Sequence, residues 1–149
     1  MDKIPTAGSI TQVILANTAL TLFTKAVQTS PSWLAYYTRG NSYLFWPKVF
    51  GRASLGVADL ERALAIQKAE PKKSYFVRVY ISLGDGYWKM DVPDKARAIW
   101  EEGLRAFPGN SALQARLSRT GDELKAYIED ALDPSKRVDT NLRELWAGK

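Results

Sequence analysis

Residues 77–110 read VRVYISLGDGYWKMDVPDKARAIWEEGLRAFPGN, and this stretch decides the fold class. Its first half places residues at the three- and four-residue steps that mark one face of a helix: Tyr80, Leu83, Gly84 and Tyr87. Asp91 to Asp94 then supply residues that favour a turn and a helix start. A second series with helical spacing follows, and Pro108 closes the segment: Ala96, Trp100 and Gly103. The stretch predicts two helices joined by a short turn.

The order of residue types in this stretch resembles the tetratricopeptide repeat, whose pattern is an aromatic, Leu-Gly, Tyr, Ala, an aromatic, a small residue and Pro. The resemblance implies an all-α fold in which antiparallel helix-turn-helix repeats stack as a short right-handed solenoid with a C-terminal capping helix. It also implies a non-catalytic scaffold that binds proteins. Gly84 and Ala96 are expected to let the two helices approach closely, so Gly84→Leu or Ala96→Asp is expected to unfold the unit.

The remaining chain predicts further units of one repeat domain over residues 1–134. Its parts are a partial unit, a modified repeat, the full repeat, and a partial repeat with a cap: residues 9–31, 32–71, 76–110 and 111–132. Prolines at 31, 71 and 108 close units at spacings of 40 and 37 residues. We expect a first helix over residues 9–29, followed by a helix with Ser30 as its N-cap. Thr120 and Glu123 are expected to form a capping box for the last helix.

Residues 135–149 follow this domain as a tail. Three apolar residues in it are spaced to share one side of a short amphipathic helix: Leu142, Leu145 and Trp146. This tail is predicted to occupy the groove of the domain, in cis or from a neighbouring copy, as one alternative to an external ligand.

The resemblance places the binding surface on the concave side, lined by first-helix residues that packing does not use. Carrying those positions over gives seven candidate partner contacts: Tyr37, Asn41, Phe45, Arg78, Ile81, Asp85 and Trp88. This mixture of aromatic, amide and charged groups suits an extended peptide or a short helix. The carboxylate clamp of chaperone-binding family members is not matched, because Tyr37 and Ser82 stand where that clamp has Lys and Asn. A solvated groove without a ligand is the alternative.

The modified repeat departs from the family pattern between its two helices. Gly40 and Gly56 are sixteen residues apart, whereas Gly84 and Ala96 are twelve apart, so four extra residues fall around residues 44–54. Pro47 is expected to end the first helix of this unit, because it has no N–H to donate.

Aromatic residues concentrate at this insertion. Seven of the seventeen aromatic residues of the chain lie between Trp33 and Phe50. Repeat packing does not account for Phe45, Trp46 or Phe50. Trp46 and Phe50 are therefore a candidate association patch for a homo-oligomer, since exposed apolar patches mark contact surfaces. The alternative is that these side chains fold back onto the domain.

Composition excludes several chemistries. The chain has no histidine and no cysteine, so disulfides, thiolate catalysis, serine triads and the usual zinc sites are excluded. We expect no enzyme activity, no metal and no cofactor. The net charge is +5, with residues 31–74 at +4, which favours an acidic protein partner over nucleic acid.

No stretch is long and apolar enough for a transmembrane helix. The first residues, MDKIPTAG, lack the features of a signal peptide. We expect a cytoplasmic protein, with an exported or periplasmic mature form as the alternative. The predicted function is an adaptor that binds a peptide segment or protein surface. The competing hypothesis is a small structural subunit held permanently in a larger assembly, which is homo-oligomeric or membrane-associated.

Overall fold

The computed structural model describes residues 7–133, and this part of the chain is helical with no β-strand. Its α-helices are α1 (Ala7–Thr29), α2 (Trp33–Leu44), α3 (Ala53–Lys68), α4 (Val77–Lys89), α5 (Pro93–Ala106), α6 (Ser111–Leu117) and α7 (Gly121–Ala131). Two short 3-10 helices, η1 (Lys48–Phe50) and η2 (Ser74–Phe76), lie in the connections before α3 and α4. The expected first helix over residues 9–29 is confirmed as α1. The tail with Leu142, Leu145 and Trp146 lies outside the described residues.

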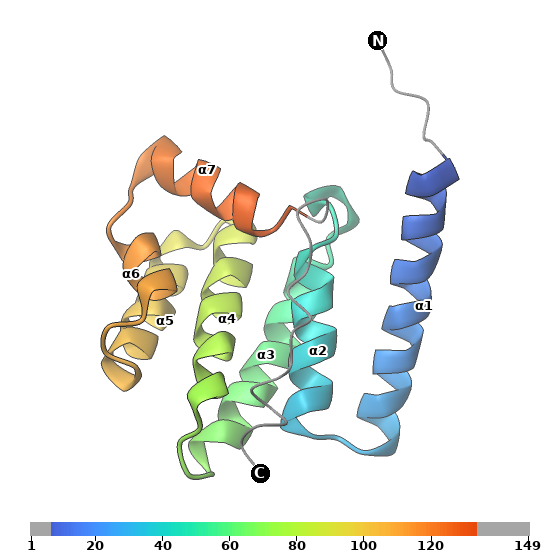
Figure 1. The fold of residues 1–149 in the computed structure, drawn as a ribbon, viewed down its shortest axis with the longest axis horizontal. Coiled ribbons are helices and arrows are strands. Elements are labelled where there is room, and N and C mark those ends of the chain that lie inside the picture. Colours follow the sequence, from blue (N-terminus) through green and yellow to red (C-terminus); the bar gives the residue numbers. More distant parts are fainter. Residues whose placement is uncertain (1–6, 134–149) are drawn as a thin grey trace.

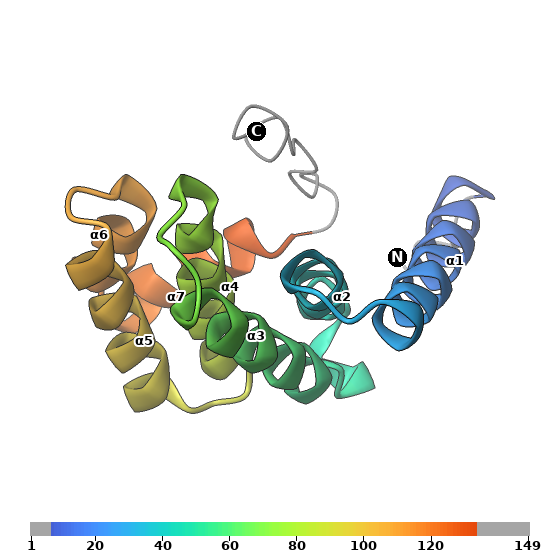
Figure 2. The same cartoon turned by 90° about the horizontal axis from the view of Figure 1, so that it is seen from below.

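The helices form a row of neighbouring pairs. Helix α2 packs against α3, α4 packs against both α3 and α5, and α1 packs against α2 at one end of the row. Figure 2 shows α2, α4 and α6 along one side of this row and α3 and α5 along the other. Helix α7 lies across the C-terminal end of α4 (Figure 1). None of the helices within residues 7–133 is long and apolar enough to cross a membrane.

Glycines set the distance between the helices of each pair. A Cβ atom added at Gly84 would lie 2.1 Å from Nε1 of Trp100, and one added at Gly56 would lie 2.7 Å from the carbonyl oxygen of Gly40. The prediction that Gly84 permits close approach of the next helix is confirmed. The residue that fills this space is the buried indole of Trp100, however, and Ala96 lies in the same core one turn earlier.

Neighbouring pairs are also joined closely. A Cβ atom added at Gly86 would lie 2.7 Å from Cγ2 of Val57, so α4 meets α3 as tightly as it meets α5. Between the first helices of the two pairs, Ser82 donates a hydrogen bond to Oδ1 of Asn41 at 2.9 Å. These contacts fix α2, α3, α4 and α5 into one core.

Two predicted helix starts differ from the structure in their capping. Ser32, and not Ser30, is the N-cap of α2, because its extended backbone lets its hydroxyl accept a hydrogen bond from the N–H of Ala35 at 3.1 Å. Thr120 is the N-cap of α7 but makes no capping bond with its side chain. The next residue, Gly121, has a positive φ of 54°, which gives the first turn a non-helical start.

The start of α5 lies where the sequence predicts it, with Asp91 in the turn and Asp94 in the first helical turn, but no side chain caps it. Its N-cap is Val92, without a side-chain bond. Asp91 has a left-handed backbone with φ of 62°, and its carboxylate forms an ion pair with Lys48 in η1. Asp91 therefore links the α4–α5 turn to η1 in the α2–α3 connection, and it does not cap a helix.

Candidate functional site

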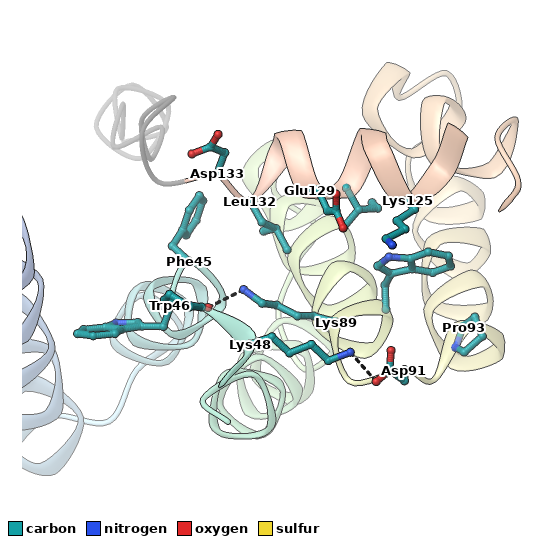
Figure 3. Close-up of a pocket in the computed structure, with 13 residues that line it drawn as sticks. Phe45, Trp46, Lys48, Lys89, Asp91, Pro93, Lys125, Glu129, Leu132 and Asp133 are labelled. Carbon is teal, nitrogen blue, oxygen red and sulfur yellow. Dashed lines mark hydrogen bonds and ion pairs between the residues drawn. The ribbon is translucent and has the colours of Figure 1, made fainter. Parts of the chain in front are cut away.

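A cavity of about 610 Å³ lies where α7 passes over the ends of α2 and α4, and we call it the end pocket (Figure 3). Its apolar lining comes from three separate segments: Phe45, Trp46, Pro47, Trp88, Pro93, Ile128 and Leu132. Six charged residues complete it: Lys48, Lys89, Asp91, Lys125, Glu129 and Asp133. Its volume lies within the range of about 300–1,000 Å³ that is typical of ligand sites.

The end of α2 builds the first wall of the end pocket. Helix α2 stops at Leu44, and Pro47 lies outside it, as the sequence predicts. The ammonium group of Lys89 donates hydrogen bonds to the carbonyl oxygens of Leu44 and Trp46, each at 2.6 Å. Because a helix leaves its last carbonyls unsatisfied, this lysine completes the end of α2 and ties it to the last turn of α4. Figure 3 shows the bond to Trp46 beneath Phe45.

The environment of Lys89 changes its titration. Burial lowers the pKa of this amine, and the nearby positive charge of Lys48 lowers it further. Two of its three N–H donors are already directed at carbonyl oxygens. Lys89 is therefore a structural support of the pocket wall.

The charged residues at the rim are mostly exposed. Lys48 and Asp91 form an ion pair at 2.6 Å, with side chains 61% and 75% exposed, so this pair contributes little to stability. Lys125 and Glu129 lie exposed on α7 above the opening. The end pocket thus presents an apolar interior and a rim in which both signs of charge are represented.

Two of the seven predicted contacts, Phe45 and Trp88, meet in the end pocket. Trp46, predicted for the association patch, lies in the same lining. Its indole is half-buried beneath the guanidinium of Arg52, 3.9 Å from the ring centroid, and makes an edge contact with Phe50 at 5.6 Å. Phe50 is 57% exposed, so only the outer part of the predicted patch faces solvent.

Three of the remaining predicted contacts, Tyr37, Asn41 and Ile81, make contacts within the fold. Tyr37 is buried and stacks on Trp33, with ring centroids 5.0 Å apart. Asn41 accepts the hydrogen bond from Ser82 described above. Ile81 is partly buried against the core, and Arg78 is half-buried on α4.

Asp85 was predicted to contact a partner, but the structure buries it between helices. Its carboxylate accepts hydrogen bonds from Nε of Arg116 at 2.6 Å and from Nη2 at 2.8 Å. Burial raises the pKa of Asp85, and the guanidinium of Arg116 partly offsets that effect. A carboxylate held in this way joins α4 to α6 and has no free face for a ligand. Asp85 is therefore a contact between helices.

Helix α7 contributes to the site in a way that was not predicted from the sequence. The last predicted helix was expected only to cap the stack, and its residues Ile128 and Leu132 were not among the candidate contacts. Both residues reach the end pocket because α7 turns across the end of α4 (Figure 3). The long-range bonds of Lys89 and Arg116 were also not predicted, since nothing in their local sequence indicates these partners.

The described residues contain no group of three or more acidic side chains placed to hold a metal ion. No protein-family model, curated protein or solved structure matches this chain. The geometry of the end pocket therefore carries the functional argument.

Proposed function

We propose that the described helices form a short tetratricopeptide-like solenoid and that the protein is a non-catalytic adaptor. Its ligand is a peptide segment of a protein partner, and the end pocket receives an apolar side chain of that segment. The observation that carries the proposal is the meeting of Phe45, Trp88 and Ile128 in one cavity, although they come from three different helices or turns.

Support for the solenoid comes from the two central helix pairs. Gly40 with Gly56, and Gly84 with Trp100, make the close contacts that the repeat pattern requires of its small positions. Pro31 and Pro71 lie between pairs, where a residue without an N–H does not interrupt a helix.

Support for an apolar ligand group comes from the charges around the cavity. Lys48 and Asp91 already pair with each other, and Lys89 already bonds to two carbonyl oxygens. Burying an unpaired charge beside these groups would cost free energy without a partner in return. Aromatic and aliphatic walls favour a large apolar side chain, whose backbone would meet the polar rim.

The absence of histidine and cysteine from the sequence supports a non-catalytic role. A structural subunit of a larger assembly is the second candidate, and the exposed apolar residues of α1 favour it. An adaptor should remain soluble and free of large aggregates when purified alone. An obligate subunit should aggregate or be recovered only with its complex.

The test begins with a random peptide library displayed on phage and selected against the full chain. Peptides that bind are synthesised, and their affinity is measured by fluorescence anisotropy. The discriminating variant is Glu129→Trp, which places an indole at the opening of the end pocket without removing a core residue. Its matched control is Asp130→Trp, the same kind of change one residue along α7 at a position that does not line the pocket.

We expect Glu129→Trp to weaken binding by at least about tenfold, which corresponds to about 1.4 kcal/mol. Asp130→Trp should leave the affinity within about twofold of the unmodified protein. Selected peptides should share a large apolar residue at one position. Equal binding by both variants, or selection of peptides without an apolar residue, would reject the end pocket as the binding site.

A further inference from the structure

Helix α1 has an apolar face that none of the other described helices covers. Ile14, Leu15 and Leu22 are 59%, 61% and 62% exposed, whereas Leu20 and Val27 are buried. Figure 2 shows α1 at the end of the row, with α2 on one side and no helix on the other. Large apolar side chains exposed in series along a helix mark a contact surface.

Helix α3 shows what the two faces of such a helix contact. One face meets the partner helix of its own pair: Gly56 lies against the backbone of Gly40, and Leu60 is buried beside it. The other face meets the next pair, where Val57 contacts Gly86 of α4. A second helix of a pair is therefore covered on two sides.

Helix α1 repeats the residue series of α3 at a distance of 37 residues. Leu20 stands at the position of Val57 and is buried, as expected for a residue that packs on the next pair. The positions that correspond to Gly56, Leu60 and Ala63 have the same small–large–small order: Ala19, Phe23 and Ala26. In α3 this series is buried, but in α1 Ala26 is exposed and Phe23 is only half-buried. Among the described residues 7–133, no helix therefore stands to α1 as α2 stands to α3.

The open face of α1 has few polar groups that need water, so its composition suits contact with another apolar helix. Lys25 is the single charged residue in α1. Thr18 and Thr21 donate their hydroxyl hydrogens to carbonyl oxygens of their own helix, at 2.9 and 3.0 Å. A helix that is apolar on two separate faces is normally buried on both.

The spacing on this face is self-complementary. Four residues follow steps of four, three and four, which is the spacing of a helix–helix seam: Leu15, Ala19, Leu22 and Ala26. If two copies of α1 run antiparallel about a twofold axis between residues 20 and 21, Leu15 lies opposite Ala26 of the other copy and Leu22 lies opposite Ala19. Each large side chain then faces a small one, which permits close packing.

Charge also permits this arrangement. In the antiparallel pair, Lys25 lies opposite position 16, which is alanine. The two Lys25 residues are then nine positions apart along the pair, or about 14 Å. This separation exceeds the Debye length of about 8 Å at physiological ionic strength, so the two ammonium groups repel only weakly.

We infer that α1 is the dimerisation helix of this protein, and that it pairs antiparallel with α1 of a second copy through the Leu15–Ala26 seam. This assignment moves self-association from Trp46 and Phe50, where the sequence placed it, to the open face of α1. It leaves the end pocket open in each copy.

Sedimentation equilibrium of the full chain tests the inference. The unmodified protein should be a concentration-dependent dimer. Leu22→Glu should weaken the dimer by at least about a hundredfold, because two carboxylates would enter an apolar seam. The control is Leu55→Glu, which changes a 52% exposed leucine on α3 and should not alter association. Circular dichroism of both variants shows that they remain folded.

Disulfide formation tests the orientation independently of any destabilising charge. Because the chain has no cysteine, introduced thiols can pair only with each other. An equimolar mixture of Leu15→Cys and Ala26→Cys proteins should give mainly the mixed disulfide under a mild oxidant. Leu15→Cys alone should cross-link at least about tenfold more slowly, since the antiparallel arrangement separates those residues by about 16 Å.

A monomer at all accessible concentrations would overturn the inference, and so would a Leu22→Glu protein that dimerises like the unmodified chain. Faster cross-linking of Leu15→Cys with itself would reject the antiparallel seam. Peptide binding to Leu22→Glu should be unchanged, so failure of the dimer leaves the adaptor proposal separately testable.

Discussion

The two central helix pairs, α2–α3 and α4–α5, solve the same packing problem in different ways. In α2–α3, glycines on both helices bring backbone against backbone, with Gly56 facing the carbonyl of Gly40. In α4–α5, Gly84 lies directly against the indole of Trp100. Both pairs close tightly, so the difference between them is not in how well the helices pack.

The difference that matters lies in the turns. Helices α4 and α5 are joined by residues 90–92, whereas residues 45–52 join α2 to α3 and include η1. Only the longer turn supplies aromatic residues, Phe45 and Trp46, to the end pocket. The helices of this molecule therefore carry its packing, whereas the longer turn adds two aromatic residues to the candidate site that α4 and α7 also line.

The largest loss of stability is expected when the buried ion pairs of the two helix pairs are broken. Arg116→Ala should destabilise the fold by about 3–5 kcal/mol, because it leaves the carboxylate of Asp85 buried without its partner. Arg39→Ala should cost about 1–3 kcal/mol, because the side chain of Arg39 is 18% exposed and water can reach Asp59 when it is removed. Urea unfolding followed by circular dichroism measures both. A larger loss of unfolding free energy for Arg39→Ala than for Arg116→Ala would contradict the expectation that Asp85 depends more on its ion-pair partner than Asp59 does.

The next effect tests the glycine contact in α4–α5. Gly84→Ala should cost about 3 kcal/mol, because its Cβ would lie within the indole of Trp100 and the buried ring has no space to move. Gly51→Ala is the control: its φ is +63° but no atom lies within 4 Å of the added Cβ, so only backbone strain of about 1 kcal/mol is expected. Equal losses in thermal unfolding would show that strain, and not contact, governs both positions.

A smaller effect concerns the support of the long turn. Lys89→Met should lower stability by about 2 kcal/mol, because two carbonyl oxygens lose a charged donor. This variant should also bind the selected peptides more weakly, since the pocket wall formed by Phe45 and Trp46 is no longer fixed to α4. Lys125→Met removes a rim lysine without those bonds and should leave stability within about 0.5 kcal/mol. If Lys89→Met binds the peptides with unaltered affinity, the position of the turn that holds Phe45 and Trp46 does not determine binding.

The smallest effect is a pH dependence at the α3–α4 contact. The hydroxyl of Tyr87 donates to the carboxylate of Glu61, and burial together with that negative charge raises the pKa of Tyr87 to about 12. Because the folded pKa is raised from 10, this contribution is fully present below pH 10 and is lost as pH rises through about 12.

Tyr87→Phe removes the group and should cost about 0.5–1 kcal/mol at neutral pH. Urea unfolding of both proteins at a series of alkaline pH values should show their difference narrowing between pH 10 and about 12. A constant difference across that interval would mean that the hydroxyl does not titrate in the folded protein as described.

Much of the helix arrangement was predictable because local residue types determine it. Gly84, Trp100 and Pro47 act through short-range sterics, so their spacing reveals helices and their ends. The insertion was also visible as a difference in spacing, and two of the predicted contacts, Phe45 and Trp88, line the end pocket, although Trp88 also packs near Trp100 of its own pair.

The direction of α7 could not be predicted, because an amphipathic pattern identifies an apolar face but not the surface that it covers. The burial of Asp85 was missed for a related reason. Its partner Arg116 lies 31 residues away, and a charged residue on a helix is usually solvated unless a long-range contact replaces water. Positions that depend on contacts between units are therefore the ones where the repeat pattern misleads.

The most direct test of the account is fluorine NMR of the protein labelled with 5-fluorotryptophan, with resonances assigned by single Trp→Phe variants. A selected peptide should shift the resonances of Trp88 and Trp46, which line the end pocket, and leave Trp33 unchanged. Trp33 lies at the opposite end of α2, about 18 Å along the helix from Phe45. A shift at Trp33 with no change at Trp88 would place the ligand elsewhere and contradict the assignment of function to the long turn.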